Sequence, residues 1–101
     1  MDLAQALINT KDYAGARQEL ERALGRSEKL GSRLETARIH YLMGDAMRLA
    51  GETSDASRQY QQALQIFDAL KKEQGAERLL DRFDLKTIYA EASRWVSTLR
   101  G

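Results

Sequence analysis

The sequence offers one side chain suited to acid–base catalysis, His40, which is the single histidine of the 101 residues. A general base needs a positioned partner and a cleft. The nearby carboxylate of Asp45 falls on a different face of the helix expected here, five residues further on. We therefore interpret His40 as a packed, hydrogen-bonded histidine and expect no catalytic residue.

The patterns of common metal and cofactor sites are also missing from the sequence. One histidine and no cysteine cannot supply the ligands of a zinc site, and they exclude disulfides. The sequence shows neither a glycine-rich phosphate loop nor a nucleophile elbow. We expect no metal and no cofactor, and we predict that the chain is not an enzyme.

Residues suited to binding lie in a row on one expected helix. They follow one another at steps of three, four and three, which places them on one face: Arg38, Tyr41, Asp45 and Arg48. Arg78 and Arg82, four apart, could extend that face. Arginine binds carboxylates through paired hydrogen bonds, and tyrosine gives rigid contact area. The row fits an acidic peptide or acidic helix, and the alternative is a solvated face with an internal Arg–Asp pair.

Helices must position these residues, because the chain has no proline and its apolar residues recur at helical spacing. We predict helices at about 2–9, 13–30, 32–50, 54–73, 76–82 and 85–99. Ser32 and Glu35 have the spacing of a capping box, which predicts the start of the third helix. Gly51 is expected to supply a turn with a positive φ.

Charge and hydropathy exclude two classes of partner. The 16 basic and 15 acidic residues give a net charge of +1, which argues against general binding of nucleic acid. No apolar run approaches the ~20 residues that cross a membrane. The first residues lack the pattern of a signal peptide, so we expect a cytoplasmic protein.

The chain matches itself at an offset of 40 residues. The matched positions are small or apolar, whereas the charged positions differ, and the pairs include Ala6 with Ala46, Ala16 with Ala56, Ala23 with Ala63, Leu24 with Leu64 and Leu30 with Leu70. Stacked repeats behave in this way, because only the interlocking residues are constrained by a neighbouring unit.

The second unit carries a recognisable pattern: His40-x-x-Met43-Gly44-x-x-Met47, Gly51, Ala56-x-x-x-Tyr60 and Ala63. It resembles a tetratricopeptide repeat over about residues 3–70, of the longer variety found in bacterial regulatory and scaffold proteins. The resemblance implies an all-α, right-handed α-solenoid of antiparallel helix pairs with a C-terminal capping helix. Residues 1–101 would form one domain, with a partial first repeat at 2–30, a second at 32–73 and a cap at 76–100. Gly44 and Ala56 should touch where two helices cross.

In this family the first helix of each unit lines a concave groove. The resemblance therefore places Gln5, Ile8 and Asn9 in the groove, together with the row on the third helix. Asp45 replaces the asparagine that some relatives use to hold a terminal carboxylate, so that mode of binding is not expected. The implied function is a protein–protein interaction scaffold, with a protein or peptide, possibly acidic, as its partner.

The two ends are expected to differ. The last helix should pack on Tyr60, Leu64 and Phe67 through its apolar stripe, which comprises Leu85, Ile88, Ala92, Trp95, Val96 and Leu99. The short first helix should leave an apolar patch only partly covered, namely Leu3, Leu7, Leu20 and Leu24. We therefore expect the C-terminal end of a longer array, and the alternative is a homo-oligomer formed through the N-terminal half.

Overall fold

The computed structural model describes the backbone of residues 2–74 and 83–100, and the side chains of residues 3–73 and 86–99. The described helices are α1 (Asp2–Asn9), α2 (Tyr13–Leu30), α3 (Arg33–Leu49), α4 (Thr53–Gln74) and α6 (Phe83–Arg100). These ranges contain no strand, which confirms the all-α prediction. The helix expected at 76–82 lies outside the described residues.

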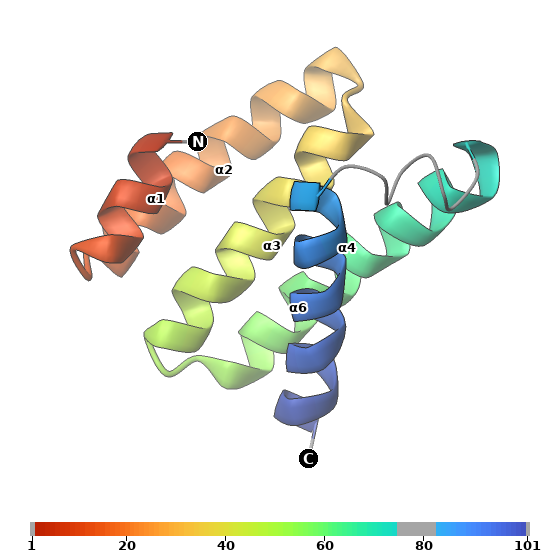
Figure 1. The fold of residues 1–101 in the computed structure, drawn as a ribbon. Coiled ribbons are helices and arrows are strands. Elements are labelled where there is room, and N and C mark those ends of the chain that lie inside the picture. The colour runs from red at the N-terminus through yellow and green to blue at the C-terminus, as the bar shows by residue number, and fades with distance from the viewer. Residues whose placement is uncertain (1, 75–82, 101) are drawn as a thin grey trace.

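Short turns make α1, α2, α3 and α4 antiparallel neighbours in succession (Figure 1). The helices α2, α3 and α4 pack in chain order, and α1 lies beside α2. Figure 1 shows that α1 lies along the N-terminal half of α2, so among the described helices it is α3 that lies beside the C-terminal half of α2. The last helix, α6, packs mainly on α4 and also touches α3.

Glycines with positive φ end two of the turns. Gly51 has φ of 89°, as expected, and Gly31 has φ of 68° at the C-terminus of α2. The capping box expected at Ser32 is wrong, because the Ser32 side chain makes no capping hydrogen bond. The N–H of Ser32 is already bound to the carbonyl of Ser27, at 2.9 Å, so it is not free to bind Glu35.

The core runs through all the described helices. Its largest fully buried side chains are Tyr60, Phe67, Leu20 and Ile39. The expectation that Leu20 is only partly covered is wrong, because Leu20 packs in one cluster with Ala4 of α1 and with Ile39 and Met43 of α3. The short α1 therefore covers the apolar face of α2 as far as Leu20.

The helices α3 and α4 cross closely at Gly44. A Cβ added to Gly44 would lie 2.7 Å from the ring of Tyr60. The residue closest to Gly44 is therefore Tyr60 and not Ala56, although Ala56 is buried in the same cluster as Tyr60. Glycine at this position lets a fully buried aromatic ring pass directly over the helix backbone.

The C-terminal helix packs as expected. Ala92 is buried in the cluster of Tyr60, and Trp95, Val96 and Leu99 pack against it. Ile88 and Tyr89 pack on the neighbouring cluster around Phe67. The side chain of Leu85, which completes the predicted stripe, is outside the described residues.

We predict that Gly44→Ala destabilises the chain by ~1–3 kcal/mol, because the new methyl group would overpack the Tyr60 ring. Gly25→Ala is the matched control, since a Cβ on Gly25 meets nothing within 4 Å. It should stabilise α2 by ~0.5–1 kcal/mol. Urea unfolding of both variants measures the difference, and equal effects would contradict the tight crossing at Gly44.

Candidate functional site

His40 is a packed, hydrogen-bonded residue, as the sequence analysis predicted. It is buried, and its Nδ1 lies 2.6 Å from Oε1 of Gln59 on α4. Within the described residues, no three side chains of the metal-binding types gather in one place. None of the described helices is both long and apolar enough to cross a membrane.

The predicted row on α3 takes part in a cluster of polar and aromatic side chains. We call this the α3 polar cluster, and it comprises Tyr41, Asp45, Arg48, Tyr60 and Trp95. The Tyr60 hydroxyl donates to Oδ1 of Asp45. It also accepts from Nε of Arg48 at 3.1 Å, while Nη2 of Arg48 lies 3.4 Å from the Asp45 carboxylate. The Arg48 guanidinium lies 4.0 Å from the centre of the Trp95 ring on α6.

Burial changes the proton affinities in this cluster. Burial raises the pKa of Asp45, although the hydrogen bond from Tyr60 and the charge of Arg48 act in the opposite direction. Burial, with the nearby Asp45 charge, raises the pKa of Tyr41 to about 12. Burial and the bond to Asp45 raise the pKa of Tyr60 as well. The two tyrosines are therefore neutral hydroxyls at physiological pH.

These contacts show that the α3 polar cluster holds helices together. The cluster joins α3, α4 and α6, because each member bonds to or stacks on another of its members. The Arg–Asp pair that the sequence left as an alternative is present in the form of Arg48 and Asp45.

The other predicted groove residues do not join the α3 polar cluster in the part of the chain that the structure describes. Arg38 is one turn before Tyr41 and lies 3.6 Å from the Glu35 carboxylate. Gln5 and Asn9 are exposed on α1, where Gln5 donates to Asn9 at 3.2 Å. Ile8 was expected in the groove, but it is buried against Ala16 and Ala46, since it points into the α1–α2–α3 core. Arg78 and Arg82 lie outside the described residues.

An apolar groove that the sequence analysis missed lies where α2 ends and α3 begins. We call it the α2–α3 groove; its volume is about 300 Å³, and it is lined by Ala23, Arg26, Ser27, Leu30, Ser32, Glu35 and Ile39. Leu30 is 83% exposed, the highest value among the large apolar side chains that the structure describes. One sequence feature could have indicated this groove. Leu30 matches Leu70 at the repeat offset, and Leu70 is buried in the structure whereas Leu30 is exposed.

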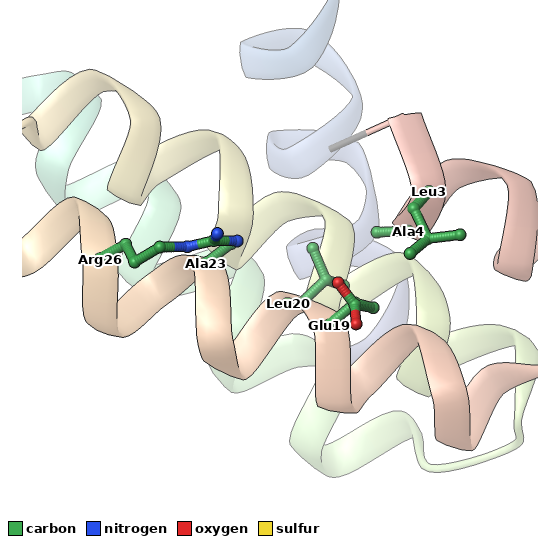
Figure 2. Close-up of a pocket in the computed structure, with 6 residues that line it drawn as sticks. All are labelled: Leu3, Ala4, Glu19, Leu20, Ala23 and Arg26. Carbon is green, nitrogen blue, oxygen red and sulfur yellow. The ribbon is translucent and has the colours of Figure 1, made fainter.

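The groove continues toward the start of α1. A smaller hollow there is lined by Leu3, Ala4, Glu19, Leu20, Ala23 and Arg26. Figure 2 shows Leu3 and Ala4 on α1 facing Leu20 on α2, with the Arg26 side chain lying along α2 toward Ala23. Ala23 and Arg26 line both hollows, so the groove begins where the cover supplied by α1 ends.

A basic edge borders the α2–α3 groove. Arg22, Arg26 and Lys29 line an adjoining surface hollow at helical steps of four and three. Arg22 pairs with Glu19 at 3.1 Å. Glu35, the carboxylate of the groove itself, pairs with Arg38. Arg26 and Lys29 form no ion pair within the part of the chain that the structure describes, so two positive charges there are not neutralised.

Comparison with known families agrees with this architecture. A family model of the tetratricopeptide repeat matches residues 1–69. The chain belongs to the tetratricopeptide-repeat family. No curated protein and no solved structure matches the sequence. Tetratricopeptide repeats generally serve as protein–protein interaction modules and are typically non-catalytic. The repeat match ends before α6, so α6 lies beyond the matched residues.

We predict that Tyr60→Phe costs about 1–3 kcal/mol, because it removes the hydroxyl that satisfies Asp45 and Arg48. Tyr89→Phe is the control, since its hydroxyl makes one exposed bond to Asp68 at 3.0 Å. The control should cost roughly 0.5 kcal/mol or less. Thermal and urea unfolding compare the two, and a Tyr60→Phe loss as small as that of Tyr89→Phe would contradict a structural role for the cluster.

The raised pKa of Asp45 predicts a pH dependence of stability. The folded chain keeps the Asp45 proton to a higher pH than the unfolded chain. The stabilisation from this group is therefore fully present below its unfolded pKa and is lost as pH rises through the folded pKa. The asparagine of the Asp45→Asn variant cannot titrate, so the variant lacks this pH-dependent loss of stability. The free energy of unfolding of the wild type should therefore fall relative to that of the variant as pH rises from the acid range to neutrality. Urea unfolding across that range tests the sign, and a constant difference would refute it.

Proposed function

We propose that this chain is a scaffold module that binds a protein or peptide partner, as one end of a larger multi-repeat protein. The observation that supports it best is the α2–α3 groove, an open apolar surface with Leu30 at its end. A large leucine at 83% exposure beside a preformed groove is typical of a contact surface for another polypeptide. The family supports the same function, since its members generally hold other proteins.

The proposed partner runs from the groove onto the concave side of the repeat. Glu35 lines the groove and contacts Arg38, so a bound chain could reach Arg38 and then Tyr41 on the same face of α3. Gln5 and Asn9 of α1 do not line the α2–α3 groove, but both are exposed, and we include them as partner contacts on the concave side. In this proposal the partner is acidic, because the groove is bordered by Arg26 and Lys29, which form no ion pair with the side chains that the structure describes.

A homo-oligomerisation module is the second candidate function. The observation in its favour is Leu3, which is 56% exposed at the α1 end of the same surface. A second copy that covers Leu3 and Leu30 would remove both exposed side chains from water. Light scattering of the free chain at increasing concentration separates this candidate from a monomer that holds a different partner.

A crosslinking experiment tests the scaffold function. The chain has no cysteine, so Leu30→Cys provides a unique position for a short photo-crosslinker beside the groove. We expect one discrete crosslinked polypeptide from extracts of the source cell. Gln65→Cys is the matched control, because Gln65 is exposed on α4 away from the groove and should give no such product. The same products from both positions, or none from Leu30→Cys, would contradict the proposal.

A further inference from the structure

We propose that α6 is a pH-sensitive cap, which separates from α3 and α4 before the rest of the chain unfolds and which ionisation of Asp45 loosens. The inference concerns the C-terminal side of the repeat and does not depend on the α2–α3 groove. Three observations support it: the shallow burial of α6, the cations that hold its aromatic residues, and two carboxylates that approach each other across the α3–α6 contact.

The apolar face of α6 is buried less deeply than the surface on which it packs. Among the described side chains of α6, only Ala92 is buried, and the other residues of the apolar face are half-buried, namely Ile88, Tyr89, Trp95, Val96 and Leu99. On α4, by contrast, Tyr60 and Phe67 are fully buried. Elements with few buried apolar side chains open at a lower free energy than the core. We therefore expect α6 to separate first.

Cations of the repeat contact two aromatic residues of α6. The Arg48 guanidinium of α3 lies 4.0 Å from the centre of the Trp95 ring. Nζ of Lys71 on α4 lies 4.2 Å from the centre of the Tyr89 ring, and the Tyr89 hydroxyl donates to Asp68 at 3.0 Å. The strength of such contacts depends on the charges and the solvent around them. The docking of α6 is therefore sensitive to nearby ionisation.

Two carboxylates lie within electrostatic range of each other across the α3–α6 contact. Asp45 belongs to α3 and is half-buried, and Glu91 belongs to α6, one turn before Trp95. The negative charge of Glu91 acts on Asp45 and also on the Tyr41 hydroxyl of α3. Like charges that are brought together by docking oppose it. Docking is therefore weakest when Asp45 and Glu91 are both ionised.

The other groups around Asp45 differ in whether they move with α6. Arg48 lies 3.4 Å from Asp45 on the same helix, and the Tyr60 hydroxyl of α4 donates to Asp45. Both stay beside Asp45 when α6 leaves, and so does Tyr41. Glu91 leaves with α6, together with Arg94, to which it pairs at 3.9 Å. The described side chains of α1 include no titratable group.

These positions give the direction of the pH effect. Burial and, to a smaller extent, the charge of Glu91 raise the pKa of Asp45 in the docked chain. Separation of α6 removes Glu91 and opens this side of α3 to water, so it lowers that pKa. Docking is therefore fully favoured below the pKa of the separated state and weakens as pH rises through the pKa of the docked state. A rise from acid to neutral pH loosens α6 and uncovers the face of α4 that carries Tyr60 and Phe67.

The single tryptophan of the chain provides a direct test. In urea unfolding, Trp95 fluorescence follows the docking of α6, and far-UV circular dichroism follows all the helices. At neutral pH the fluorescence midpoint should lie at a lower urea concentration than the dichroism midpoint, and the two should converge as pH is lowered. Coincident midpoints at neutral pH, or a separation that does not change with pH, would overturn the inference.

Matched substitutions assign the effect to the two carboxylates. Glu91→Gln removes the charge on α6 and should bring the two midpoints closer at neutral pH. Glu19→Gln is the control, because Glu19 likewise pairs with an arginine three residues later, at 3.1 Å, but on α2. Asp45→Asn should abolish the pH dependence of the separation. A Glu91→Gln effect no larger than that of Glu19→Gln would contradict the role of the carboxylates.

Hydrogen exchange of the wild-type chain tests the same inference without a substitution. The amides of α6 should exchange through openings that leave α4 protected. After correction for the intrinsic exchange rate, these openings should be more frequent at neutral than at acid pH. Exchange of α6 only together with α4 would refute a separable cap. None of these measurements involves a partner, so their outcome is independent of the proposed scaffold function.

Discussion

The Tyr60 ring lies directly over the backbone of Gly44, and the packing of α3 against α4 depends on this contact. The approach brings α3 and α4 close enough for one cluster of apolar side chains to reach from α1 to α6. It also places the Tyr60 hydroxyl beside Asp45 and Arg48, inside the protein. A carboxylate in such a place is costly unless its lone pairs are satisfied, so the hydroxyl and the guanidinium are needed where they are.

The consequence is that the polar face of α3 serves the fold. Arg48 is bonded to Tyr60 and stacked on Trp95, so the face that resembles the peptide groove of other tetratricopeptide repeats helps to hold α6. The aromatic contact of Phe67 with Tyr89 secures the same helix further along α4. The C-terminal side of the repeat is thereby closed by residues of this chain.

The two units solve the same packing problem with different residues. In the second unit, α3 is long enough to cover the whole apolar stripe of α4, and Leu70 is buried. In the first unit, α1 covers the stripe of α2 only as far as Leu20 and Ala23. The remaining stripe ends at Leu30, which is 83% exposed, with Arg26 beside it in the α2–α3 groove.

The sequence by itself determined the helices, their turns and the repeat. Apolar spacing and glycines fix these features through local geometry, so α1 and α2 match their predicted bounds and Gly51 has the predicted positive φ. The apolar stripe of α6 and the buried state of His40 could be predicted for the same reason, since a helix buries the face that its periodicity marks.

Only the tertiary structure decided which polar residues are available. Spacing places Arg38, Tyr41, Asp45 and Arg48 on one face, but it cannot show that Tyr60 and Trp95, distant in sequence, approach that face and bind two of its members. The Ser32 capping box failed because the N–H it needed was bound by the preceding helix. The α2–α3 groove was missed because it depends on how far one helix extends along another. Exposure is a property of the packed neighbours of a residue, and the periodicity of a single helix does not contain it.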